Sequence, residues 1–344
     1  MKTVGIIVEY NPLHNGHLHH IMETRRISQC DCLIAVMSGN FTQRGEPAIV
    51  DKFTRTKMAL LNHVDLVIEL PFVFSVQSAD IFAYGSVSLL HHLQVDEIYF
   101  GSESGSIEEL TELSNIINCP EYDILLQKHL KKGNSYPTSS DLAVKELTSS
   151  IIYHQPNNIL GIQYISALKK LKSNIILKTI KRASTNYHDP LTSDTNIQSA
   201  TAIRELMKNN GDFSNFVPSI VSDLLQNRKA VDIEDFTQFL KYQIASSSAK
   251  DLEKNFMMNE GLENRMKKID HFDSIEDFIK QIISKRYTNS KLKRTIIHLF
   301  KSRIKSGRTT KPKEELIKYT PTTRDTKNKI TPTFIMIKFN KQHI

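Results

Sequence analysis

Four histidines lie within seven residues near the start of the chain: His14, His17, His19 and His20. The apolar run Val4–Val8 that precedes them is typical of a buried strand, and residues 17–28 are typical of a helix. If this helix begins near Asn15 or Gly16, its unpaired N–H groups and the positive end of its dipole face whatever lies above the strand. The segment therefore predicts an anion site that is bordered by histidines.

His14 and His17 are the residues that we expect to act on the anion. An imidazole can donate a hydrogen bond to a phosphate oxygen, and Gly16 lets a ligand approach the backbone closely. This arrangement suits a nucleotide whose α-phosphate is under attack. Two other interpretations are a metal site and a solvated helix start without chemistry. A metal ion needs further ligands, and no nearby cysteine or carboxylate has a convincing spacing, so we assign none.

Strands alternate with helices over the first two hundred residues. After the first strand, the pattern predicts strands over residues 32–37, 65–70, 97–100 and 174–181, and helices over residues 51–62 and 78–93. In the helix over residues 51–62, we expect the following apolar side chains to form the buried stripe: Phe53, Met58, Leu60 and Leu61. Strands that alternate with helices in this way indicate an α/β fold with a parallel sheet.

The carboxyl ends of parallel strands form the edge at which ligands of such sheets bind. The segments after residues 8, 37 and 100 fall on that edge. Lys181 and Arg182 follow the last predicted strand and place two cations there. One of Asn157 and Asn158, which follow Pro156, is expected to cap a helix.

We predict three regions along the chain: residues 1–210, a catalytic domain with a helical insertion at about residues 106–170; residues 211–305, a basic helical domain; and residues 306–344, a tail. From residue 218 the apolar spacing is helical throughout. After about residue 306, a run rich in Lys, Thr and Pro lacks periodicity and is typical of a loop or of disorder.

The positive charge is concentrated in the second part of the chain. The net charge is +8, but residues 1–200 carry 17 Lys and Arg against 20 Asp and Glu, whereas residues 201–344 carry 28 against 17. The first part therefore has a net charge of −3 and the second of +11. Such asymmetry indicates a polyanionic partner, although lysine-rich helices with solvated faces would give the same count.

Residues 284–294 are the most basic segment and interleave five cations with one aromatic residue, Tyr287. The cations can contact phosphate, and we expect Tyr287 to stack on an unpaired base. The alternative is a helix capped by Thr288 or Ser290 that turns a basic face to solvent.

Composition places the chain among ordinary globular proteins, because 344 residues with 40% apolar content suffice for a core and about two domains. The longest apolar stretch, residues 64–76, is interrupted by Asp65, Glu69 and Pro71, so no membrane association is expected. No signal peptide precedes the first strand. The three cysteines lack metal or disulfide spacing, and we expect the cytoplasm.

Residues 11–17 (NPLHNGH), directly after a strand, resemble the HIGH-type nucleotidyltransferase superfamily. A longer set of segments resembles the bacterial tRNA(Met) cytidine acetate ligase family: residues 5–12 (GIIVEYNP), 37–41 (MSGNF), 44–48 (RGEPA), 100–103 (FGSE) and 156–161 (PNNILG). The resemblance implies a Rossmann-like HIGH nucleotidyltransferase domain followed by an all-helical domain. It also implies formation of N4-acetylcytidine at the wobble position, C34, of elongator tRNA(Met) from acetate and ATP through acetyl-adenylate.

The resemblance further implies His14 and His17 as catalytic residues, and a set of residues that bind ATP: Ile7, Val8, Glu9, Tyr10, Asn11, Pro12, Leu13, His14, Asn15, Gly16, His17, Leu18, His19, His20, Gly101, Asn157, Arg182, Thr201 and Arg204. The Asn157 amide suits the adenine edge or the ribose, and the Arg182 guanidinium suits phosphate or adenine. Mg²⁺ is expected to accompany ATP, but we can name no protein ligand for it.

Residues 199–204 partly match the second superfamily signature, which is written ISSTxxR. Ser199 and Thr201 supply hydroxyl groups and Arg204 follows one turn later, but Ala200 replaces a hydroxyl residue. We expect Thr201 and Arg204 to face the β- and γ-phosphates. The alternative is an ordinary N-cap on an amphipathic helix that runs to Asn209.

Three functions remain open at this point. The first is an ATP-dependent ligase that acts on tRNA(Met) with acetate. The second is a nucleotidyltransferase that adenylylates a small phosphorylated cofactor precursor, which would explain the histidine motif but not the basic second part. The third is a non-catalytic RNA-binding protein on the same scaffold.

Overall fold

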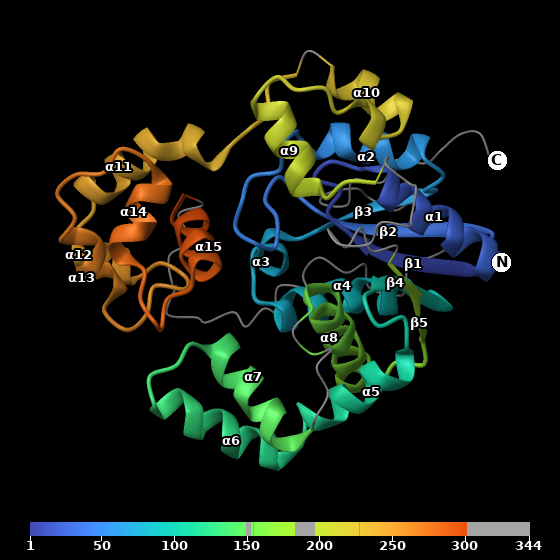
Figure 1. Cartoon of the computed structure of the whole chain (residues 1–344), viewed down its shortest axis with the longest axis horizontal. Helices are drawn as coiled ribbons and strands as arrows, with labels where there is room; N and C mark the ends of the chain where they lie inside the picture. Colours follow the sequence, from blue (N-terminus) through green and yellow to red (C-terminus); the bar gives the residue numbers. More distant parts are fainter. Residues whose placement is uncertain (149–152, 154, 183–196, 227, 301–344) are drawn as a thin grey trace, which may run out of the picture.

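The computed structural model describes residues 1–148, 153, 155–182, 197–226 and 228–300 (Figure 1). At its centre is a five-stranded sheet with the order β3-β2-β1-β4-β5, in which every pairing is parallel. The strands are β1 Thr3–Val8, β2 Cys32–Ser38, β3 Leu66–Leu70, β4 Glu97–Ser102 and β5 Ile176–Lys181. The predicted parallel α/β sheet is therefore confirmed, and the end of the central strand, β1, leads directly into the histidine segment.

The central strands of the sheet are buried on both faces, because the side chains that point to either face are apolar. In β2, Leu33, Ala35 and Met37 belong to the core on one face, and Ile34 and Val36 belong to the core on the other. A parallel sheet needs this continuous apolar sequence because helices cover both sides.

Helices cover both faces of the sheet. The first face is covered by α1 Asn15–Ser28, α2 Lys52–Leu61, α9 Ala200–Lys208, the short 3₁₀ helix η2 Ser214–Phe216 and α10 Ser219–Leu225. The second face is covered by α3 Phe72–Ser75, α4 Ala79–His92, α5 Ile107–Ile116 and α8 Pro156–Leu171, with α6 Pro120–Lys131 and α7 Tyr136–Leu147 as a pair beyond them (Figure 1). The predicted insertion thus contains two helices of the sheet layer and one helical pair.

The predicted buried stripe of α2 is wrong at two positions. Phe53 and Leu61 are 54% and 45% exposed, whereas Arg55 is completely buried together with Met58 and Ala59. A helix buries residues three and four positions apart, so the face through residues 55, 58 and 59 is the one that meets the sheet. The polar identity of Arg55 concealed this face in the sequence.

The remaining helices form a separate core: η3 Ile233–Phe236, α11 Thr237–Ser246, α12 Ala249–Glu253, α13 Leu262–Lys267, α14 Ile275–Ile282 and α15 Asn289–Phe300. Helix α10, in contrast, packs on α2, and its residues Val221 and Leu225 belong to the core of the sheet domain. The domain boundary at residue 210 stays a prediction, and the predicted tail at residues 306–344 lies outside the described residues. Within the described part of the chain, no helix is long and apolar enough to cross a membrane.

Candidate functional site

Helix α1 begins at Asn15, as predicted, and His14 is its N-cap residue. The His14 carbonyl accepts hydrogen bonds from the backbone N–H groups of His17 (2.8 Å) and Leu18 (3.0 Å). The His14 N–H donates in return to Nδ1 of His17 at 3.3 Å, and the two imidazoles stack with ring centroids 3.7 Å apart. Because Nδ1 of His17 is an acceptor, the ring hydrogen of neutral His17 lies on Nε2.

Gly16 makes room for the His14 ring. A Cβ atom at this position would lie 3.0 Å from Cε1 and 3.1 Å from Nδ1 of His14, which is tighter than ordinary contact. Nδ1 of His14 is buried without a hydrogen-bond partner among the described residues, and so is Nε2 of His20. Buried polar atoms are normally satisfied, so these ring nitrogens are available to a ligand.

The histidines at the start of α1 are held neutral. Burial, and after it the positive charge of Arg182, lowers the pKa of His14 to about 4, and the same two causes lower the pKa of His20 to about 4. Burial also lowers the pKa of His17 well below its ordinary value, with His14 and Arg182 adding to the shift. At neutral pH the positive potential of this edge therefore comes from the helix dipole and the arginines.

Four other predicted residues of the first segment differ in how far they are buried. Tyr10 and Leu13 are buried in the sheet-domain core, so their ligand contacts would come from the backbone. His19 is exposed to solvent. Asn11 is buried, and its Oδ1 accepts the backbone N–H of Ile49 at 2.7 Å, which ties this loop to the loop after β2.

Gly101 and Arg182 lie side by side at the ends of β4 and β5. The Arg182 N–H donates to the Ser102 carbonyl at 2.9 Å, and a Cβ atom on Gly101 would lie 3.3 Å from Cγ of Arg182. The Arg182 side chain is exposed, yet its charge acts on the histidines of α1. The structure therefore brings these two predicted residues to the same sheet edge as the histidine motif.

Asn157 and Asn158 lie at the start of α8, but neither is its N-cap, so the predicted capping role is wrong. The helix was expected to begin at Ile159 but begins three residues earlier, at Pro156, and Gln155 is the N-cap. Asn157 instead donates from Nδ2 to Glu103 at 2.6 Å, and Oδ1 of Asn158 accepts the backbone N–H of Glu103 at 3.0 Å. The Glu103 carboxylate takes over the capping, because it also accepts the N–H of Asn158 at 2.9 Å.

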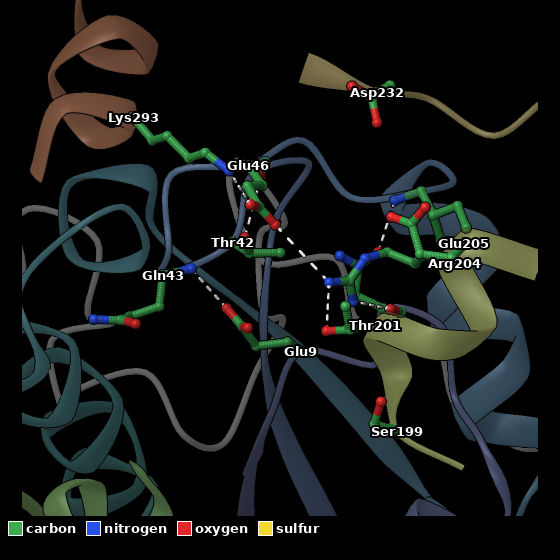
Figure 2. Close-up of polar contacts among 12 residues, drawn as sticks. Glu9, Thr42, Gln43, Glu46, Ser199, Thr201, Arg204, Glu205, Asp232 and Lys293 are labelled. Atoms are coloured by element: carbon green, nitrogen blue, oxygen red, sulfur yellow. Dashed lines mark hydrogen bonds and ion pairs between the residues drawn. The ribbon is translucent and has the colours of Figure 1, made fainter. Parts of the chain in front are cut away.

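The second motif meets the first through Arg204. Its NH1 donates to the Asn11 carbonyl at 3.0 Å, and its NH2 donates to Oγ1 of Thr201 at 3.1 Å (Figure 2). Ser199 is the N-cap of α9 and accepts the Ala202 N–H at 3.1 Å, so the alternative capping interpretation is correct for Ser199. Thr201 and Arg204 nevertheless lie beside the loop that carries the histidine motif.

Arg55 is a part of this edge that the sequence analysis missed. It is completely buried, and its guanidinium donates to the carbonyls of Glu9 (2.5 Å), Ser38 (3.1 Å) and Gly39. Burial lowers the pKa of Arg55 to about 10, and the charge of Glu9 opposes that shift. Arg55 thus fastens together the carboxyl ends of β1 and β2. In the sequence, its spacing of three and four residues from Met58 and Ala59 indicates that it shares their buried face of α2.

The basic segment at residues 284–294 differs from its prediction. Tyr287 is only 3% exposed and its hydroxyl donates to the carbonyls of Asn259 (3.0 Å) and Glu260 (3.1 Å), so the predicted stacking on a base is wrong. Oγ1 of Thr288 accepts the Lys291 N–H at 3.3 Å and caps α15, as the alternative interpretation expected. Lys285 and Arg286 remain exposed.

The described residues contain no group of three or more His, Cys, Asp or Glu side chains that could hold a metal ion. Arg182 places a positive charge beside His14, His17 and His20. The geometry fits an anionic ligand better than a protein-bound cation.

Comparisons with known proteins agree with this geometry. The family described as HIGH Nucleotidyl Transferase matches residues 1–321. The tRNA(Met) cytidine acetate ligase of Caldicellulosiruptor saccharolyticus is 43% identical over 307 residues, which cover 87% of this chain and 76% of the relative. The enzyme of the same name from Lysinibacillus sphaericus is 42% identical over 316 residues, or 87% of this chain and 78% of the relative.

A solved structure is similar over most of the chain. The crystal structure of Thermotoga maritima TmcAL bound with alpha-thio ATP has a TM-score of 0.81 and 36% sequence identity, and it covers 89% of this chain and 76% of that chain. The resemblance therefore extends from the short motifs to the arrangement of the whole sheet domain and beyond it.

Proposed function

Because the chain belongs to the HIGH nucleotidyltransferase family and to the tRNA(Met) cytidine acetate ligases within it, we propose that it activates acetate with ATP and acetylates tRNA(Met). The product is N4-acetylcytidine at C34 of the elongator tRNA, and acetyl-adenylate is the intermediate. The relatives carry this activity in their name, and the similar Thermotoga maritima protein binds alpha-thio ATP.

The observation that carries the proposal is the contact between Arg204 and the Asn11 carbonyl, 3.0 Å long. It joins two motifs that lie nearly two hundred residues apart in the sequence at one sheet edge. The start of α9 therefore lies beside the loop that leads into α1, an arrangement that suits a triphosphate. The α-phosphate lies at the histidines, and the β- and γ-phosphates lie toward Thr201 and Arg204.

Acetate is a poor acyl donor, so its carboxylate must gain a good leaving group before an amine can attack. Acetate displaces pyrophosphate at the α-phosphorus, and the negative charge that develops on the phosphoryl oxygens is stabilised by His14, His17 and the N–H groups of α1. Both rings act here as neutral hydrogen-bond donors. Arg182 and Arg204 supply the fixed positive charge that an α,β-phosphate bond needs as it breaks.

The Asn157 amide suits the nucleoside end of ATP. The Asn157 Nδ2 group is engaged by Glu103, so its Oδ1 is the atom that can accept a hydrogen bond from adenine or ribose. In the second step the N4 amine of the cytidine attacks the acetyl carbon and AMP leaves. Positioning dominates both steps, since no covalent enzyme intermediate is required.

Mg²⁺ would neutralise the triphosphate when it accompanies ATP. The described residues offer no cluster of ligands for it, so we expect the phosphates and water to hold the ion. We place the protein in the cytoplasm, because a tRNA substrate is found there and Cys30, Cys32 and Cys119 are free thiols.

Pyrophosphate release separates the candidate functions. We expect release from ATP to require acetate; stimulation by a phosphorylated precursor would select the adenylylation of a cofactor precursor instead. Failure of both compounds to stimulate release would leave an RNA-binding protein. The assay needs no tRNA, so it tests the first step alone.

A further inference from the structure

One carboxylate, that of Glu46, lies between two cations from different domains (Figure 2). Its Oε1 lies 2.6 Å from Nζ of Lys293 on α15, and its Oε2 lies 4.0 Å from NH2 of Arg204 on α9. All three side chains are 20–28% exposed, so their charges are screened less than those of a surface pair. Glu46 thus connects the helical domain to the arginine of the second motif.

The loop that carries Glu46 is fixed at both ends. The Thr42 N–H donates to the Glu46 carbonyl at 2.8 Å, and the Gln43 N–H donates to the Glu9 carboxylate at 2.7 Å, at the end of β1. Gly45 has φ 79° and packs on α15 so closely that a Cβ atom would lie 2.7 Å from the carbonyl carbon of Lys293. The loop is therefore a rigid support rather than a free surface segment.

Helix α15 has a second fixed contact with the sheet domain. Nε2 of the buried His298 lies 2.9 Å from the Val76 carbonyl, in the segment after α3, and the His298 ring meets the Phe72 ring at 4.9 Å. Two loops on the ligand edge of the sheet thus hold α15, and the position of Lys293 relative to Glu46 is determined by packing.

We propose that Lys293 and Glu46 are positioning residues of the ATP site, which the helical domain therefore completes. This inference rests on the proposed function. The Glu46 carboxylate orients the Arg204 guanidinium from 4.0 Å. Lys293 holds the same carboxylate and so keeps it from drawing the guanidinium away from Thr201 and the Asn11 carbonyl. Without Lys293, Glu46 can pair fully with Arg204 and compete with phosphate for it.

Charge reversal distinguishes this role from simple docking of the two domains. Exchanging the two residues, Glu46→Lys with Lys293→Glu, restores the ion pair between the domains but places a cation beside Arg204. If the pair only docks the domains, the exchange recovers everything that the single change loses. If the pair positions Arg204, the exchange recovers the docking alone.

The test measures the dissociation constant of a non-hydrolysable ATP analogue by calorimetric titration, together with the melting temperature, in the full chain. Glu46→Gln removes the carboxylate that orients Arg204, and Lys293→Met lets that carboxylate pair fully with Arg204, so each variant should weaken binding of the analogue about tenfold. The matched control is Lys254→Met, which removes a lysine paired at 2.7 Å with Asp251 in the same domain. It should leave the dissociation constant unchanged.

We expect the charge exchange to return the melting temperature to that of the wild type while binding stays about tenfold weaker. Wild-type affinity in Lys293→Met and Glu46→Gln, or recovery of affinity by the exchange, would overturn the proposal. The titration involves no turnover, so a wild-type protein that binds the analogue but releases no pyrophosphate with acetate would refute the proposed function and leave this result standing.

Discussion

The buried histidines at the start of α1 act without a charge of their own. His14 is 4% exposed, its ring stacks on His17, and a Cβ atom at Gly16 would lie 3.0 Å from its Cε1. A charged imidazole there would face Arg182, whose charge lowers the pKa of both rings. In the proposed mechanism the two residues therefore serve as oriented hydrogen-bond donors, and the arginines carry the charge.

Replacing His14 or His17 by Ala should reduce acetate-dependent pyrophosphate release about 100- to 1000-fold, because one donor to the developing phosphoryl charge is lost. Circular dichroism and melting temperature serve as controls, since both rings are packed. Unchanged release in both variants would remove the histidines from the mechanism.

The same burial makes the folded state sensitive to acid. The folded-state pKa of His14 and of His20 is about 4, below the ordinary value of 6.5. The unfolded chain therefore binds more protons between these pH values, and the free energy of unfolding should fall as the pH falls from about 6.5 to about 4. The slope is up to about 1.4 kcal/mol per pH unit for each histidine.

Urea denaturation at several pH values measures this slope, and the double variant His14→Gln with His20→Gln is the comparison. The variant should lose part of the dependence within that window. An identical slope in the wild type and the variant would mean that other groups dominate acid unfolding.

Arg182→Lys should raise the apparent ATP constant clearly while the melting temperature changes little. Lysine keeps the charge but loses the planar guanidinium that can bind phosphate at two points or stack on adenine. The exposed side chain contributes little to the free energy of unfolding, so a change in the ATP constant would not reflect a loss of folded protein. Steady-state rates of pyrophosphate release against ATP concentration decide, and an unaltered constant would assign Arg182 to the solvated surface.

At the scale of the elements, the segment before α15 still offers exposed cations for RNA. Lys293 is engaged with Glu46, whereas Lys285 and Arg286 of the same segment are exposed. Reversing both charges to Glu should weaken tRNA binding at low salt, and the salt slope should fall by about one unit for each lost contact.

The control for this experiment reverses Lys131 and Lys132, two adjacent exposed lysines at the end of α6 in the acidic part of the chain. The two variants have the same net charge, so a general loss of attraction affects both equally. Equal tRNA affinity in the two variants, measured by filter binding, would place the RNA surface elsewhere. Acetyl-adenylate formation should stay normal in both.

The strands could be predicted because short apolar runs bounded by turn residues are typical of buried strands. Each of the five strands begins within two residues of its predicted start. The start of α1 could also be predicted, since Gly16 and the polar run after it mark a helix that leaves a strand.

Predictions failed where a polar residue is buried by contacts that are distant in the sequence. Arg55 satisfies carbonyls from two strand ends, and Tyr287 places its hydroxyl on the carbonyls of residues 259 and 260. Glu103 caps α8 in place of the expected asparagine, although 54 residues separate it from Asn157. Local spacing carries no information about such partners, so the capping and stacking predictions relied on residue type alone.

At the scale of the whole molecule, the helical domain meets the sheet domain at the ligand edge. The contacts of α15 with the loops after β2 and β3 place the helical domain beside the proposed ATP site rather than at the far side of the sheet (Figure 1). We therefore expect a tRNA that binds the helical domain to lie close to that site.

This arrangement accounts for two substrates of very different size. ATP and acetate need only the start of α1, the second motif and the ends of β4 and β5. The tRNA needs a large positive surface and access to the same edge.

The most direct test of the account is mass analysis of elongator tRNA(Met) after incubation with the protein, acetate and ATP. The account predicts gain of an acetyl group on the cytidine at position 34, with no gain when acetate or ATP is omitted. The control is the same tRNA with uridine at that position, which should stay unmodified. An unmodified cytidine, although the protein binds both ATP and the tRNA, would contradict the central claim.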